Sequence, residues 1–143
     1  MILVHGTCVA ISGRGILLRG PSGGGKSDLA LRLIDGGALL VADDQTRLER
    51  DGDGLVASPP ATIAGMIEVR GLGLVRLPYL ERAPLELVID LVSSSGVERL
   101  PEANTLELLG LPVRHLRLAP FEASAAAKVR LAMRASTRDI MPP

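Results

Sequence analysis

A glycine-rich run that ends in Lys-Ser spans residues 20–27. It fits the pattern G-x-x-x-x-G-K-[ST], in which backbone N–H groups cradle the phosphates of a nucleotide. Glycines let this loop curl around one anion, and the following helix adds partial positive charge. Lys26 would reach the β- and γ-phosphates, and the Ser27 hydroxyl would ligate Mg²⁺. The residues expected to bind ATP are Gly20, Pro21, Ser22, Gly23, Gly24, Gly25, Lys26 and Ser27.

Two adjacent carboxylates, Asp43 and Asp44, follow the apolar run 38–42. A continuous apolar run is typical of a strand that is buried on both faces. Alternation along the strand sends the two side chains to opposite sides, so one can face Mg²⁺ and phosphate while the other does different work. A solvated Asp-Asp turn is the alternative, and the position after a buried strand favours the functional interpretation.

Two more stretches carry polar residues that could take part in chemistry. Glu68 and Arg70 precede Gly71 and Gly73 and share one face if this segment is extended. Glu68 could ligate a metal ion directly or through water, or it could form a surface pair with Arg70 that contributes little. Spacing alone favours neither interpretation. His5 lies in the first expected strand, where a lone His is more often structural than functional.

The elements that must position these residues form a βαβ unit. A short apolar run, 16–18, precedes the glycine-rich loop, and apolar side chains recur at helical spacing over 27–34. The strand that ends before Asp43 should therefore run parallel to the strand that feeds the loop. Their carboxyl ends then meet at the edge where open α/β sheets bind ligands.

Most of the remaining chain is predicted to form strands and hairpins. Expected strands cover 2–11 and 16–19 in one hairpin, 45–50 and 55–58 in a second, a half-exposed strand over 85–92, and 105–108 and 111–118 joined tightly. Alanine-rich 121–134 predicts a C-terminal helix, whose Lys128, Arg130 and Arg134 are expected on a solvated face. The expected fold class is α/β, a mixed sheet with flanking helices and β-hairpins, in a single domain over 1–143.

Composition limits the function classes. The chain has 143 residues, 47% of them hydrophobic, which suffices for one domain with its own core. Lys plus Arg equals Asp plus Glu, at 16 each, so the basic excess that nucleic-acid binding needs is absent. With one Tyr, one Phe and no Trp, base stacking on aromatic platforms is not expected.

Location is predicted from what the sequence lacks. No apolar run approaches the ~20 residues of a membrane helix, and no secretory signal is recognised, so no membrane association is expected. The single cysteine, Cys8, lies in an apolar run and is expected to be a core thiol. These features predict a cytoplasmic protein.

Four stretches together resemble the catalytic domain of the HPr kinase/phosphorylase family. They are His5-Gly6, the glycine-rich loop with the helix after it, Val41-Ala42-Asp43-Asp44, and residues 67–73, in matching order and spacing. This bacterial family phosphorylates a serine of the small phosphocarrier HPr and removes that phosphate by phosphorolysis. The resemblance implies a P-loop kinase-like fold of the HPr kinase and PEP carboxykinase type, with ATP and Mg²⁺ as cofactors. It also implies an HPr-like phosphocarrier as partner and a role in regulating the phosphotransferase system.

The resemblance also implies roles for single residues. His5 matches the active-site His of the family, Lys26 its catalytic P-loop Lys, and Ser27 a Mg²⁺ ligand. Asp44 matches the base that takes the proton from the substrate serine, and Glu68 matches the second Mg²⁺ ligand. Because an unperturbed carboxylate is a weak base, we expect burial or the neighbouring Asp43 carboxylate to raise the pKa of Asp44.

Three further points of the resemblance concern the remaining chain. The segment Glu98-Arg99-Leu100 is similar to the place of a further catalytic Arg, which would be Arg99. His5 stands almost at the start, so the long N-terminal domain of the family is expected to be missing, as in shortened versions from some proteobacteria. Residues 119–124 keep only the Pro of a Pro-Gly-Arg-Asn type loop that is tied to dephosphorylation. This departure puts phosphorylase activity in doubt, along with the family's hexamer, and leaves a homo-oligomer open.

Two other functions remain as alternatives. A regulatory module that binds nucleotide without phosphotransfer would bind ATP and label no phosphocarrier. A small-metabolite kinase would need a mobile lid that carries arginine, and the polar segment 93–104, with one arginine, is the only candidate.

Overall fold

The computed structural model describes residues 1–135 and 139–143. In chain order its strands and helices are β1 (Ile2–His5), β2 (Thr7–Ile11), β3 (Arg14–Arg19), α1 (Lys26–Asp35), β4 (Leu39–Ala42), β5 (Gln45–Asp51), β6 (Gly54–Ser58), β7 (Met66–Val69), β8 (Gly73–Arg76), β9 (Ala83–Leu91), β10 (Asn104–Leu108), β11 (Leu111–Leu118) and α2 (Ala125–Arg134). Short 3-10 turns occupy Ala61–Ile63 and Ser94–Gly96. Among these residues, no helix is long and apolar enough to cross a membrane.

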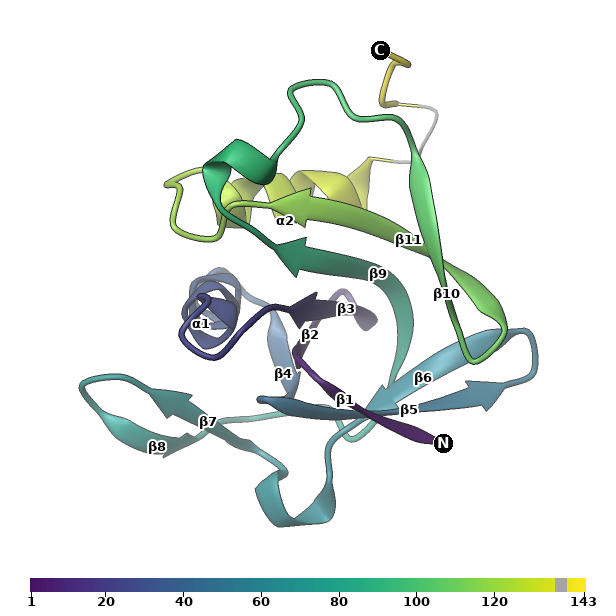
Figure 1. Ribbon diagram of the computed structural model, residues 1–143. Coiled ribbons are helices and arrows are strands. Elements are labelled where there is room, and N and C mark those ends of the chain that lie inside the picture. The colour runs from purple at the N-terminus through teal and green to yellow at the C-terminus, as the bar shows by residue number, and fades with distance from the viewer. Residues whose placement is uncertain (136–138) are drawn as a thin grey trace.

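One curled sheet forms the body of the molecule (Figure 1), with strands in the order β1-β5-β6-β9-β3-β2-β4. From β9 the sheet continues into β11 and β10, whereas β7 and β8 form a separate hairpin. In Figure 1 the arrowheads of β3, β9 and β11 point to the side of the molecule from which the β7–β8 hairpin projects. The carboxyl ends of several strands and this hairpin thus share one side of the sheet.

The predicted parallel relation between β3 and β4 is confirmed, with another strand between them. β2 is antiparallel to β3 in the predicted hairpin and also antiparallel to β4, so β3 and β4 run in the same direction. The direct parallel neighbour of β3 is β9, which is in turn parallel to β11. The loop after β3 and the residues after β4 therefore meet at one edge, as the βαβ pattern predicts.

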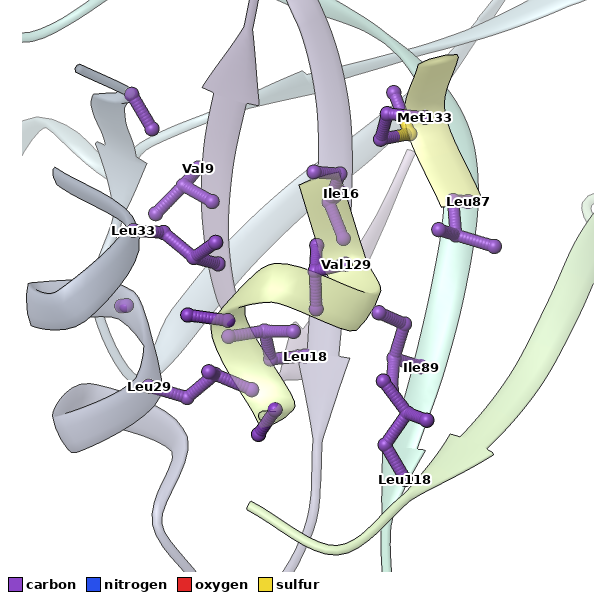
Figure 2. Packing of buried hydrophobic residues seen from close by; sticks show 14 of the residues in the cluster. Val9, Ile16, Leu18, Leu29, Leu33, Leu87, Ile89, Leu118, Val129 and Met133 are labelled. Atoms are coloured by element: carbon purple, nitrogen blue, oxygen red, sulfur yellow. The ribbon is translucent and has the colours of Figure 1, made fainter. Parts of the chain in front are cut away.

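Two hydrophobic clusters cover the two faces of the central strands. On one face, Leu29 and Leu33 of α1 and Val129 of α2 pack against Leu18 and Ile89 of the sheet (Figure 2). On the other face the curl brings β5 and β6 over β2, β3 and β9, with residues such as Leu48, Leu17 and Val88 in contact. The core is aliphatic, as the near absence of aromatic residues predicts, and it holds the P-loop strand rigidly from both sides.

Most predicted elements are confirmed, with three differences. The predicted half-exposed strand, β9, is half-exposed only at its start; Val88 and Ile89 are both fully buried because each faces one of the two clusters. α2 begins at Ala125 rather than at residue 121, and a turn precedes it. Arg130 does not lie on a fully solvated face, because its guanidinium donates to the Arg32 carbonyl at the end of α1 at 3.0 Å.

Candidate active site

The P-loop joins β3 to α1 and has the backbone geometry that the pattern requires. Gly23 and Gly25 adopt left-handed conformations, with φ of 75° and 93°, and Gly25 caps the helix. The Gly24 N–H donates to the Pro21 carbonyl at 2.8 Å, which closes the turn. The N–H groups of the first helical turn have no partner within the helix and, with the helix dipole, form an anion site.

Lys26 is almost fully buried, with 5% of its surface exposed. Its ammonium donates to the carbonyl oxygens of Gly20 at 2.8 Å and Pro21 at 2.9 Å. An ammonium group has three donors, so one more N–H remains for an oxygen of a phosphate. The two carbonyls therefore fix the position of the charge inside the loop.

Asp43 connects three separate parts of the site. Its Oδ1 accepts a hydrogen bond from the Ser27 hydroxyl at 2.7 Å and one from the Thr7 hydroxyl at 3.1 Å. Its Oδ2 accepts the backbone N–H of Glu68 at 3.0 Å. This carboxylate is 7% exposed and ties the start of α1, the start of β2 and the β7–β8 hairpin together.

Asp44 lies beyond β4, which ends at Ala42, and its side chain has a different partner from that of Asp43. Its backbone is left-handed, with φ of 66°, which is rare for a residue other than glycine. Its N–H donates to the Thr7 hydroxyl at 3.1 Å and its carbonyl accepts the Gly6 N–H at 2.8 Å, so this conformation is held from both ends. The side chain is 61% exposed, so the burial expected for it is not found.

His5 and Asp44 form a side-chain pair. Nε2 of His5 lies 2.9 Å from Oδ1 of Asp44. An ionised carboxylate can only accept, so the proton of this bond belongs to Nε2 of His5. The bond occupies Oδ1 of Asp44 and not Oδ2.

The residues present fit a Mg²⁺ ion that is bound mainly through a nucleotide. Among residues 1–135 and 139–143, no group of three or more His, Cys, Asp or Glu side chains could hold a metal ion by itself. Mg²⁺ is usually bound by one or two carboxylates together with substrate phosphates and water. Ser27, Asp43 and Glu68 offer a hydroxyl and carboxylates of this kind beside the phosphate loop. The Glu68 side chain is exposed, and its backbone N–H is fixed by Asp43.

Arg99 and His115 lie apart from this cluster in the hydrogen-bond network. Arg99 is exposed and lines an open cavity with Asn104, His115 and Lys128, and within the described residues no hydrogen bond connects it to the P-loop. Its catalytic role stays a prediction from the resemblance. His115 is a buried strand residue whose Nε2 lies 2.7 Å from Oδ2 of Asp90.

Asp90 joins this second network to the strand that feeds the P-loop. Its two oxygens accept from Nε and Nη2 of Arg19, at 2.8 and 3.0 Å, directly before the loop. Burial would raise the pKa of Asp90, but the hydrogen bonds and charges of Arg19 and His115 outweigh it and lower the pKa. The end of β3 is thereby fixed to β9 by an ionised carboxylate.

Comparison with known proteins decides the family. The family model described as HPr Serine kinase C-terminal domain matches residues 1–130. The chain belongs to this family. A protein named HPr kinase/phosphorylase from Bordetella pertussis is 39% identical over 127 residues, which cover 80% of this chain and 41% of the relative. One of the same name from Burkholderia lata is 40% identical over 121 residues, covering 77% and 38%. The chain thus spans about two fifths of these curated relatives.

A solved structure agrees with this assignment to the HPr kinase family. The structure titled Hpr(Ser) kinase/phosphatase from Coxiella burnetii matches with a TM-score of 0.82 at 26% identity, and the match covers 94% of this chain and 89% of that chain. The P-loop kinase-like fold predicted from the sequence is therefore confirmed. The resemblance predicted from four short motifs extends over nearly the whole chain.

Two features of the site do not follow from the sequence. Alternation predicts that one of Asp43 and Asp44 faces Mg²⁺ and phosphate but not which one, and Asp43 is the carboxylate that contacts the P-loop serine. Thr7 was not singled out, although its hydroxyl donates to Asp43 and accepts from the Asp44 N–H. No local pattern marks Thr7.

Proposed function

We propose that this chain is an ATP- and Mg²⁺-dependent protein serine kinase that acts on an HPr-like phosphocarrier. The observation that carries the proposal is that the adjacent carboxylates of Asp43 and Asp44 have different surroundings. Asp43 is buried against Ser27 and the β7–β8 hairpin, while Asp44 faces solvent beside His5. The family, and relatives named HPr kinase/phosphorylase, support the same activity.

In the proposed reaction the P-loop positions the phosphates and neutralises their charge. Backbone N–H groups of the loop and the Lys26 ammonium hold the β- and γ-phosphates. Ser27, Asp43 and Glu68 would hold Mg²⁺, directly or through water. When bound, this ion neutralises negative charge on the β- and γ-phosphate oxygens. The protein's task is mainly to position the reactants and stabilise charge, because phosphoryl transfer needs little covalent help.

Asp44 accepts the proton of the attacking seryl hydroxyl as the new serine oxygen–phosphorus bond forms and the bond to the β,γ-bridging oxygen breaks. His5 donates to Oδ1 and so orients the carboxylate, with Oδ2 directed to the incoming hydroxyl. ADP leaves with the bridging oxygen. In the reverse direction, phosphate bound at the P-loop would replace ADP as the attacking group and yield pyrophosphate.

The openness of the site favours a protein substrate over a small metabolite. The Asp44 side chain is 61% exposed. On the β7–β8 hairpin, which Asp43 anchors to the site, Leu72 and Leu74 are 78% and 72% exposed. A serine on the surface of another protein can reach such a carboxylate, and exposed apolar side chains suit contact with that protein.

The test is phosphate transfer from labelled ATP to a panel of purified HPr-like phosphocarriers, with and without Mg²⁺. We expect label on a serine of at least one carrier only when Mg²⁺ is present. Adding inorganic phosphate afterwards tests whether the label is released as pyrophosphate. ATP binding without label on any carrier would contradict the proposal and favour a regulatory nucleotide-binding module.

A further inference from the structure

Phe121 is the only phenylalanine of the chain and lies exposed beside the P-loop, with 71% of its surface accessible. A single exposed aromatic residue is common on protein surfaces and needs no explanation by itself. The surroundings of Phe121 set it apart. A carbon atom placed on the Cα of Gly25 as a Cβ would lie 3.1 Å from Cζ of Phe121, so the ring borders the phosphate loop directly.

The backbone on both sides of Phe121 is fixed to α1. The guanidinium of Arg32 donates to the carbonyl oxygen of Pro120 and, at 3.3 Å, to that of Glu122. Arg32 also pairs with Asp28 at 3.0 Å in the first turn of the same helix. Pro120 is buried, whereas the ring of Phe121 is left in solvent. The protein therefore holds this segment rigidly against the P-loop helix and presents one aromatic ring at its surface.

Topology places Phe121 and the carboxylates on opposite flanks of the P-loop. β3 leads into the loop, β2 and β4 lie on one side of it, and β9 and β11 lie on the other. Asp43 and Asp44 follow β4, and Phe121 follows β11. A nucleotide whose γ-phosphate faces Asp44 extends its ribose and base away from that residue, because the phosphates and the base are at opposite ends of the molecule.

We propose that Phe121 is the stacking platform for the purine base of the bound nucleotide. This proposal rests on the proposed function for the orientation of the phosphates. Every purine presents a π-face, and one ring suffices for one base. The low aromatic content that disfavours binding to nucleic acid is therefore compatible with a single stacked nucleotide. The ring touches the base and not the transferred phosphate, so Phe121 determines nucleotide affinity and not the chemical step.

Calorimetric binding of Mg²⁺·ADP and of Mg²⁺·pyrophosphate separates contacts to the base from contacts to the phosphates. We expect Phe121→Ala to weaken ADP binding by about 10-fold or more and to leave pyrophosphate binding unchanged. Phe121→Trp should retain the ADP affinity. Leu131→Ala removes an exposed apolar side chain of α2 (56% exposed) and serves as the matched control, with wild-type affinity for both ligands.

The single phenylalanine also provides a direct reporter. With ¹³C-labelled phenylalanine, the ring signals come from Phe121 alone, and tyrosine labelling gives Tyr79 as an internal control. Stacking should move the Phe121 ring signals upfield with Mg²⁺·ADP and not with Mg²⁺·pyrophosphate.

Each outcome counts for or against the inference. Equal losses for the two ligands, or no loss for ADP, would overturn the stacking role even if the wild-type protein phosphorylates a carrier. A selective loss for ADP in a protein that labels no carrier would support stacking and contradict the kinase proposal. If the wild-type protein does not bind ADP, both proposals fall.

Discussion

The Ser27 hydroxyl donates to Oδ1 of Asp43 at 2.7 Å, and this bond joins the P-loop to the end of β4. The two residues come from different ends of a βαβ unit and meet because β3 and β4 run in the same direction. Oδ2 of the same carboxylate accepts the Glu68 N–H, so the P-loop and the β7–β8 hairpin share one anchor. A change at Asp43 should therefore affect both metal binding and the hairpin.

Asp43→Asn should weaken Mg²⁺ binding at the site and loosen the hairpin. The amide keeps one oxygen for Ser27 and Thr7, but its NH₂ group then faces the Glu68 N–H, and two donors oppose each other. An unpaired buried donor costs about 1–3 kcal/mol, which urea denaturation would measure. The Mg²⁺ concentration needed for half-maximal ADP binding should rise as well.

The matched control for this change is Asp53→Asn in the exposed turn between β5 and β6. It makes the same chemical change away from the site. The seven residues of β5, a strand about 20 Å long, separate this turn from Asp44. Wild-type stability and Mg²⁺ dependence in Asp43→Asn would show that the anchor has no energetic role.

Gly25→Ala and Gly23→Ala together separate backbone strain from steric clash. Both positions have positive φ, which costs an alanine about 1–2 kcal/mol. A Cβ at Gly25 would lie 2.9 Å from Cβ and Cγ of buried Pro120, whereas a Cβ at Gly23 meets nothing within 4 Å. In urea denaturation we expect Gly25→Ala to lose ~1–3 kcal/mol more unfolding free energy than Gly23→Ala loses. Equal losses of unfolding free energy in the two variants would mean that Pro120 shifts away from the new Cβ without cost.

Asp90 should make the fold sensitive to acid. Burial opposes its ionisation, but Arg19 and His115 hold its pKa below the ordinary value of 3.8. Since the folded pKa is the lower one, its stabilisation is complete above the unfolded pKa and is lost as the pH falls through the folded pKa. Between about pH 5 and pH 2.5, the wild-type protein should lose more unfolding free energy than Asp90→Asn. Parallel pH profiles for the two proteins would refute this linkage; Asp53→Asn should follow the wild type.

Cys8 should be inert in the folded protein. Burial raises the pKa of its thiol from 9.0 to about 12, although a backbone hydrogen bond from Ile16 lowers it slightly. Since only the thiolate reacts, iodoacetamide at pH 8 should modify Cys8 at the rate at which the protein unfolds. A cysteine introduced at exposed Ala127, in a Cys8→Ala background, should react as fast as a free thiol. Rapid modification of Cys8 in the folded protein would show that the core opens locally.

The local parts of the site could be predicted from the sequence because each depends on a short segment. Glycines before Lys26 and helical spacing after it specify the P-loop and α1. The apolar run before Asp43 specifies a buried strand, and its direction follows from the βαβ rule. That β2 lies between β3 and β4 does not follow from this rule, which gives handedness and direction but not the neighbours of each strand.

The long-range contacts of the site could not be predicted, for physical reasons that differ among residues. Alternation predicts that Asp43 and Asp44 diverge, but not that Asp43 is the one that faces Ser27. Glu68 is anchored through its N–H, a group that nearly every residue has. Phe121 reaches Gly25 only after α1, β9 and β11 have packed together, and no pattern along the chain encodes that contact.

The most direct test of the central claim is single-turnover phosphate transfer by Asp44→Asn to a carrier that the wild-type protein phosphorylates, at saturating ATP and Mg²⁺. Asn keeps the shape and the bond with His5 but cannot accept the seryl proton. We predict a loss of about 100-fold or more in the transfer rate, with ADP affinity within about 2-fold of wild type. Asp53→Asn should transfer at the wild-type rate. Transfer by Asp44→Asn at the wild-type rate would contradict the assignment of Asp44 as the base.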